Sequence, residues 1–169
     1  MSYHLPVMAR ECLDQLQIDP AGTYVDVTFG GGGHSKLILE QLGPEGRLLA
    51  FDQDPDAEKN LPADERLLFA AANFRHLKRY LRLYGIKQVD GILADLGVSS
   101  HQLDVPERGF SFRFTAGLDM RMNQQDGPTA AEILAHTPVD ELQYVFGTYG
   151  EVRNARTLAQ RIGEARDQQ

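Results

Sequence analysis

The chain has 169 residues, 42% of them hydrophobic, and a formal net charge of −7 at pH 7. It can bury an ordinary core, and no apolar stretch approaches the length of a membrane span. The negative charge argues against a nucleic-acid footprint over the whole surface but leaves room for a local basic patch. Cys12 is the single cysteine, which excludes an internal disulfide and a cysteine metal cluster. We therefore expect a cytoplasmic protein without a metal.

Apolar periodicity and turn residues predict alternating helices and strands over the first 100 residues. This alternation indicates an α/β fold with a parallel sheet and right-handed crossovers. The expected elements are a helix over 6–16, strands over 24–28, 47–52, 67–71 and 89–94, helices over 35–42 and 74–84, and a short helix opened by Asp54-Pro55.

The composition changes after residue 100. Residues 101–128 are polar, rich in Gly and Arg and without a strand pattern, and 129–166 are helical in character. Thr137 is expected to cap one helix, with Asp140 three residues later, and Gly147 to Gly150 to end it. We therefore divide the chain into a sheet unit over 1–100 and a unit of loop and helices over 101–169.

Four consecutive glycines, residues 30–33, follow the first expected strand and precede a helix. Glycine lets the backbone approach a ligand closely, and a helix N-terminus adds N–H donors. Asp52 ends the next strand 22 residues beyond Gly30, the spacing at which an acid meets ribose hydroxyls. A nucleoside-containing cofactor is therefore expected, and Asp26 before the glycines favours a methyltransferase-like loop over a dinucleotide-binding one.

Asp95 ends the fourth expected strand. In open α/β sheets, ligands lie outside the carboxyl ends of the strands, near the point where the strand order reverses. Asp95 is therefore expected to face the same crevice as Gly30; the alternative is an Asp that only caps a loop.

Four basic residues recur at helical spacing over 75–82. A solvated face of an amphipathic helix is the favoured interpretation, and contact with nucleic-acid phosphates is the alternative. The stripe consists of Arg75, Lys78, Arg79 and Arg82.

Several blocks go beyond what fold propensity explains. Together they resemble the bacterial family of 16S rRNA cytosine-N4 methyltransferases (RsmH, also called MraW), from about His4 to the C-terminus. Members of that family transfer a methyl group from S-adenosylmethionine to the exocyclic amine of a cytidine in the decoding region of 16S rRNA. The blocks are the glycine loop over 28–35, residues 93–100 with 102–104, Glu107-Arg108-Gly109-Phe110-Ser111-Phe112 and Leu118-Asp119-Met120-Arg121-Met122.

The resemblance implies a Rossmann-like S-adenosylmethionine-dependent methyltransferase sheet, with its first four strands in the order 3-2-1-4, and then the start of a helical insertion. It also implies 16S rRNA in the small ribosomal subunit as partner. Asp95 is a candidate catalytic residue, because an acceptor bonded to the cytosine amine would help to localise its lone pair. Arg79, Arg82, Arg108, Arg113 and Arg121 are candidate RNA contacts. The resemblance implies seven cofactor-binding residues, to which we add Gly30 from the glycine loop. The full set is Gly30, Gly32, Gly33, His34, Asp52, Phe74, Asp95 and Gln102.

Two other functions stay open: a non-catalytic module that binds cofactor or RNA, and a nicotinamide-dependent oxidoreductase. Family members are nearly twice as long and complete the sheet after the insertion, so the chain is expected to be an N-terminal fragment with little or no methyl transfer. Its fourth strand would then be an apolar edge, which invites pairing with another chain. The expected outcomes are a homodimer through this edge, cover by the chain's own helices, or membership of a longer chain.

Overall fold

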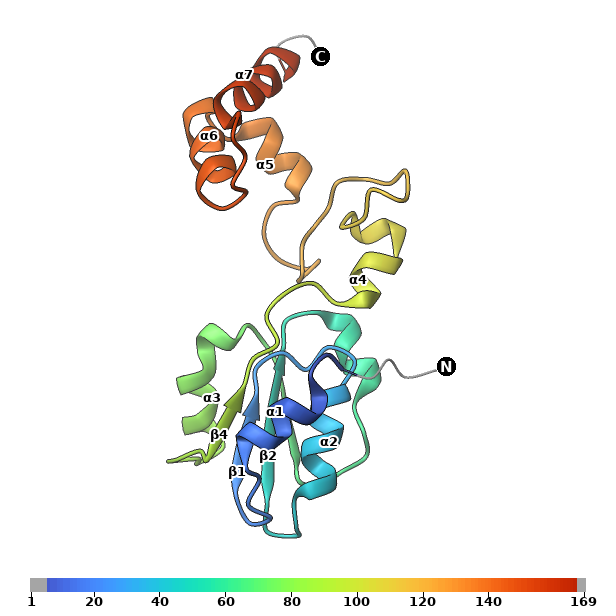
Figure 1. Ribbon diagram of the computed structural model, residues 1–169, viewed down its shortest axis with the longest axis vertical. Helices are drawn as coiled ribbons and strands as arrows, with labels where there is room; N and C mark the ends of the chain where they lie inside the picture. Colours follow the sequence, from blue (N-terminus) through green and yellow to red (C-terminus); the bar gives the residue numbers. More distant parts are fainter. Residues whose placement is uncertain (1–5, 167–169) are drawn as a thin grey trace. The chain divides into compact units, whose positions relative to one another are not determined.

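A computed structural model describes residues 6–166 of the chain. These residues form two compact units, shown in Figure 1. The first runs to Ser100 and also contains Met122–Gln124; the second comprises His101–Arg121 and the chain from Gln125 onward. Across residues 6–166, every helix is too short or too polar to cross a membrane.

The first unit is built on a four-stranded parallel sheet with the order β3-β2-β1-β4. This order and the parallel pairing confirm the Rossmann-like fold expected from the sequence. Tyr24 of β1 lies beside Leu48 of β2 and Gly91 of β4, so β1 is central. The strands are β1 (Thr23–Asp26), β2 (Arg47–Asp52), β3 (Leu67–Ala71) and β4 (Gly91–Leu93).

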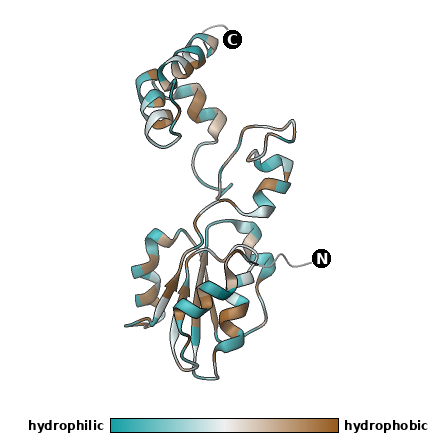
Figure 2. Cartoon of the chain, in the orientation of Figure 1, coloured by the Kyte–Doolittle hydropathy of each residue, from teal (hydrophilic) through white to brown (hydrophobic). Residues whose placement is uncertain are grey.

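Helices cover both faces of this sheet. Alternate strand residues point to opposite faces: Leu48 packs with α1 (Ala9–Leu16) and α2 (Gly33–Gln41), and Leu49 packs with α3 (Leu77–Leu83). Figure 2 shows the strands as predominantly hydrophobic, in keeping with a sheet that is buried on two sides. The core therefore holds the strands in place, and because the strands are parallel, their carboxyl ends all lie at the same end of the sheet.

Two short 3₁₀ segments complete this unit. Asp54 caps η1 (Pro55–Asn60) by accepting a 3.0 Å hydrogen bond from the Asp56 amide, as its sequence predicts. The helix expected over 74–84 begins as η2 (Phe74–His76) and continues as α3, which ends at Leu83. Gly85, two residues later, has a φ of +67°.

β4 is shorter than expected, with three residues instead of six. At its carboxyl end the Asp95 amide donates to the Thr28 hydroxyl instead of to a backbone carbonyl, so the ladder stops. Among the described strands β4 pairs with β1 alone, and Ile92 is half exposed. Within residues 6–166, β4 is therefore an edge strand of the sheet, as the sequence predicts.

The second unit is helical. α6 and α7 pack together and bury Leu142 and Ala159. Its elements are α4 (Ser100–Asp104), of which all residues but Ser100 belong to this unit, η3 (Pro106–Arg108), α5 (Ala130–His136), α6 (Val139–Thr148) and α7 (Ala155–Arg166).

The predicted cap at Thr137 is wrong. Thr137 ends α5, donating its amide to Ile133, and α6 begins after Pro138 without a side-chain cap. The true capping box lies one helix earlier, where the Thr129 hydroxyl and the Glu132 carboxylate bond each other's backbone amides. The Thr-x-x-Glu pattern that marks it is visible in the sequence.

Candidate functional site

The glycine loop connects β1 to the N-terminus of α2. Gly30 and Gly32 both have positive φ, +51° and +76°. The Gly32 amide donates to the Phe29 carbonyl at 2.7 Å, which turns the chain back toward the helix. The loop is therefore a tight turn that needs glycine for its conformation at two positions.

Asp52, at the end of β2, fastens this loop to the neighbouring strand. Its Oδ2 accepts from the Gly30 amide at 2.7 Å and its Oδ1 from the Asp54 amide at 2.9 Å. Burial raises the pKa of the Asp52 carboxyl above its usual value, although these two amides act in the opposite direction. Each carboxylate oxygen keeps a further lone pair, so Asp52 can still accept from a diol while it holds the loop.

Asp26, the last residue of β1, is a buried carboxylate in the same region. Its Oδ2 accepts from the Ser35 hydroxyl of α2 at 2.7 Å, and its Oδ1 accepts from the Thr28 amide at 3.0 Å. Burial raises the pKa of Asp26 against these hydrogen bonds. Since the folded-state pKa is raised, the protonated Asp26 contributes fully to the free energy of unfolding below the ordinary pKa near 3.8. This contribution is lost as the pH rises through the folded-state pKa. The carboxylate thus ties α2 and the loop to the end of β1.

Asp95 follows β4, the strand on the other side of β1. Its side chain is 58% exposed, and its Oδ2 lies 4.0 Å from Nδ1 of the buried His34 ring. The other ring nitrogen of His34 lies 3.1 Å from the Val7 carbonyl, so the imidazole links the N-terminal segment to the helix start. The ends of three adjacent strands therefore each present a carboxylate in this unit.

The four glycines have different surroundings. A Cβ on Gly32 would lie 2.9 Å from the Phe29 ring, and one on Gly33 would lie 3.1 Å from Pro6. A Cβ on Gly31 would meet nothing within 4 Å, and one on Gly30 only the Thr28 carbonyl at 4.0 Å. The open part of the loop is thus Gly30 and Gly31. A side chain at residue 32 would clash with Phe29, and one at residue 33 would be in tight contact with Pro6.

The remaining expected cofactor residues differ in position. Phe74 begins η2 in the first unit and is 43% exposed. Gln102 belongs to α4 in the second unit and is buried. The first unit therefore contains seven of the eight expected residues. Sequence reasoning left out Thr28 and Ser35, whose hydroxyls both bond Asp26.

The basic stripe lies on η2 and α3 and is exposed. Arg79 and Arg82 face solvent, while Leu77, Tyr80 and Leu81 pack against the sheet. This matches the amphipathic face that the sequence predicts, and the alternative of phosphate contact stays a prediction.

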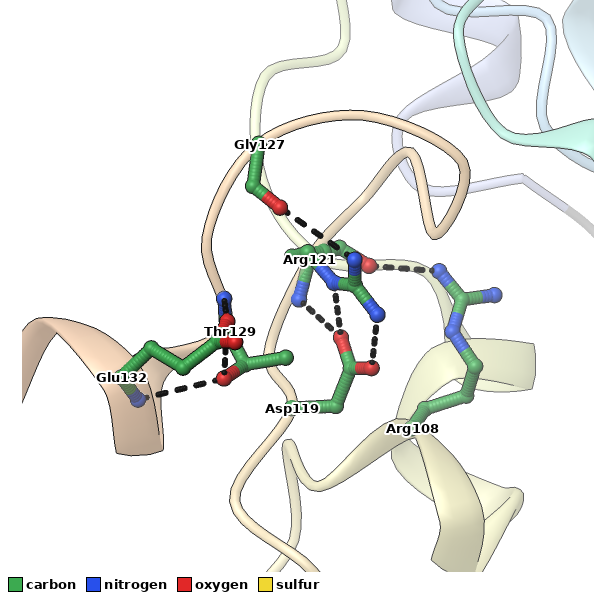
Figure 3. A network of polar contacts seen from close by, with 6 residues as sticks. All are labelled: Arg108, Asp119, Arg121, Gly127, Thr129 and Glu132. Atoms are coloured by element: carbon green, nitrogen blue, oxygen red, sulfur yellow. Dashed lines mark hydrogen bonds and ion pairs between the residues drawn. The ribbon is translucent and has the colours of Figure 1, made fainter.

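Arg108 and Arg121 of the second unit have partners within that unit, which Figure 3 shows. Arg108 is only 2% exposed and donates to the Arg121 carbonyl at 3.0 Å. Arg121 forms a two-pronged ion pair with Asp119, with Nη2 to Oδ2 at 2.7 Å. Arg108 therefore lacks the exposed position that a phosphate contact requires. In contrast, the Arg113 side chain is 59% exposed, although it is paired with Asp104.

The ion pair between Asp119 and Arg121 predicts acid sensitivity. Hydrogen bonds from Arg121 lower the pKa of Asp119 to about 2. A lowered folded-state pKa means that the pair's stabilisation is complete above the ordinary value near 3.8 and is lost as the pH falls toward 2. Asp119→Asn should lower the free energy of unfolding at pH 7 by on the order of 1 kcal/mol. Its melting temperature should then fall less steeply than that of the wild type between pH 4 and pH 2; parallel curves would contradict this role.

Comparison with known proteins identifies relatives over the whole sequence. A sequence model of the MraW methylase family matches residues 1–169. "Ribosomal RNA small subunit methyltransferase H" of Flavobacterium johnsoniae is 58% identical over 166 residues, which cover 98% of this chain and 55% of the relative. The protein of the same name from Bacteroides thetaiotaomicron is 54% identical over 169 residues, with 100% and 56% covered. The chain thus spans about half the length of the curated relatives it matches.

Proposed function

Because the chain belongs to the MraW methylase family, we propose that it forms the cofactor-binding part of an S-adenosylmethionine-dependent methyltransferase. The proposed acceptor is the N4 amine of a cytidine in the decoding region of 16S rRNA, within the small ribosomal subunit in the cytoplasm. The observation that carries this proposal is the bond from Gly30 to Asp52, which joins a glycine loop to an acid at the end of the adjacent strand.

The chemistry of these groups fits the parts of S-adenosylmethionine. Asp52 offers carboxylate lone pairs to the ribose hydroxyls, and the exposed ring of Phe74 offers a surface to the adenine. The exposed carboxylate of Asp95 suits the ammonium of the methionine part, and the N-terminus of α2 suits its carboxylate. The open space above Gly30 and Gly31 leaves room for a ligand on the loop.

When bound, S-adenosylmethionine supplies a methyl group activated by its sulfonium. The residues of the chain would bind and orient the reactants, which converts a bimolecular step into a local one. The cytosine must leave its stack for its amine to reach the crevice. Asp95 is the candidate acceptor for a hydrogen of that amine, because its carboxylate is exposed at the end of β4.

RNA contact is proposed for the exposed arginines. Arg79 and Arg82 on α3 and Arg113 in the second unit present guanidinium groups to solvent, as phosphate binding requires. We assign Arg108 and Arg121 to the support of the surrounding loop instead, because their side chains bond within it.

The edge of β4 is a further place for a partner. A strand edge with an exposed apolar residue such as Ile92 can pair with another strand. A second copy of this chain is one candidate, which would make a homodimer, and light scattering on the purified protein measures that state directly.

The function is tested by titrating the purified chain with S-adenosylmethionine and, separately, with NAD, in a calorimeter. Binding of S-adenosylmethionine alone is expected; binding of NAD alone would favour an oxidoreductase. A methylation assay on small ribosomal subunits then separates an active transferase from a module that binds cofactor without turnover.

Asp52→Ala is expected to weaken binding of S-adenosylmethionine by about tenfold or more, because charge-assisted hydrogen bonds are worth roughly 1.5–3 kcal/mol each. The matched control is Asp90→Ala, whose carboxylate accepts from the Thr23 amide at the opposite end of β1. Both variants lose a carboxylate that bonds the backbone, but only Asp52 belongs to the proposed site. Equal affinities in the two variants would remove Asp52 from the ribose position.

A further inference from the structure

Thr28 lies where the backbone pairing of β1 and β4 ends. The last backbone bond between these chain segments runs from the Val27 amide to the Leu93 carbonyl, at 3.0 Å. Beyond it, the Asp95 amide donates to the Thr28 hydroxyl at 2.8 Å. A side chain thus replaces the backbone carbonyl that would continue the ladder, because the chain after Thr28 turns into the glycine loop.

The direction of the hydroxyl is determined by its two neighbours. A backbone amide can only donate, so the Thr28 oxygen must accept from Asp95, and its own hydrogen is directed to Oδ1 of Asp26 at 3.3 Å. Asp26 is in turn bonded to Ser35 at the start of α2. The hydroxyl is therefore held from the buried end of β1.

The placement of Asp95 depends on this bond. Its carboxylate is 58% exposed, and the ionisable side chain that the structure places beside it, the His34 ring, is 4.0 Å away. Side-chain contacts therefore constrain the carboxylate weakly, and its position follows from the backbone of residue 95. That backbone is attached to β1 through the Thr28 hydroxyl.

We propose that Thr28 is a positioning residue of the site. Its hydroxyl donates to the buried Asp26 carboxylate and accepts from the Asp95 amide, and so holds the backbone of Asp95 in place. This inference rests on the proposed function, in which Asp95 contacts the cofactor. Thr28 itself need not touch any ligand.

The test replaces the hydroxyl in matched variants. Thr28→Val keeps the shape of the side chain and removes the acceptor, and Thr28→Ser keeps the acceptor. Calorimetry should show affinity for S-adenosylmethionine about 3- to 10-fold lower for Thr28→Val, because a hydrogen bond is worth roughly 0.5–1.5 kcal/mol net. Thr28→Ser should stay within about twofold of the wild type on the same reasoning. Thr28→Ala gives the same comparison without a methyl group beside Asp26, should the valine variant fail to fold.

A double-mutant cycle separates positioning from general destabilisation. In an Asp95→Ala background, Thr28→Val should change affinity by less than about twofold, because the side chain it positions is absent. The proposal would be overturned if Thr28→Val lowered the affinity for S-adenosylmethionine equally in the wild-type and Asp95→Ala backgrounds. It would also be overturned if Asp95→Ala weakened binding while Thr28→Val in the wild type did not.

A measurement without ligand keeps this inference distinct from the proposed function. Hydrogen exchange of the Asp95 amide, followed by NMR, should be at least about tenfold faster in Thr28→Val than in the wild type and in Thr28→Ser. Unchanged exchange would refute the role of Thr28, whether or not the chain binds S-adenosylmethionine. If exchange is unchanged in Thr28→Val and the wild type binds S-adenosylmethionine, only the role of Thr28 is refuted and the proposed function stands. If exchange is faster in Thr28→Val but the wild type does not bind S-adenosylmethionine, only the proposed function is refuted.

Discussion

Gly32→Val is expected to destabilise the first unit by about 2–5 kcal/mol and to abolish cofactor binding, through two separate costs. Gly32 has a φ of +76°, a conformation that a β-branched residue adopts only under strain. A Cβ at this position would also lie 2.9 Å from the Phe29 ring, which is buried. Thermal denaturation measures the first effect and calorimetry with S-adenosylmethionine the second.

Gly31→Ala is the matched control for this variant. Gly31 is the preceding residue, its φ is not in the left-handed region, and a Cβ there would meet nothing within 4 Å. Its unfolding free energy should therefore stay within about 0.5 kcal/mol of the wild type. A Gly32→Val protein that melts like Gly31→Ala would show that the tight turn does not need glycine at residue 32.

The elements of the first unit could be predicted where local pattern and burial coincide. β2 and β3 have the predicted bounds, because each is a short apolar run that ends in a turn. The edge strand β4 could not be bounded in this way. Its pairing ends where Asp95 bonds a side chain 67 residues earlier, and no local pattern contains that partner.

The glycine run shows a similar limit. The sequence predicts a loop that approaches a ligand, but it does not separate ligand contact from internal contact. Gly33 is packed against Pro6, and Gly32 against Phe29. In both cases another part of the chain lies close to the glycine, and the sequence alone does not identify which atoms these are.

The arginines show why residue type alone is insufficient for the RNA contacts. Arg79 is exposed as its helical spacing predicts. Arg108 is buried, because its guanidinium bonds the Arg121 carbonyl and lies 6.0 Å from the centre of the Phe110 ring. In a polar, irregular segment no periodicity indicates which side chains face inward. The sequence therefore does not distinguish a buried arginine from one that is exposed and can bind phosphate.

Gly109→Ala is expected to destabilise the second unit by about 3 kcal/mol or more, through left-handed strain and a backbone clash. Gly109 ends η3 with a φ of +72°. A Cβ there would lie 2.6 Å from the Gly117 carbonyl and 2.7 Å from the Asp119 amide. Both are backbone atoms, which a rotamer change cannot move away, so the two chain segments must separate.

That separation would weaken the bond from the Met120 amide to the Arg108 carbonyl, which is 2.9 Å long and closes this loop. Hydrogen exchange at Met120 should therefore be at least about tenfold faster in Gly109→Ala. Gly117→Ala is the control from the facing segment: its φ is not left-handed, and a Cβ there would meet nothing within 4 Å. Equal exchange at Met120 in both variants would mean that the loop tolerates a side chain at residue 109, and that the close approach of the two segments does not hold it together.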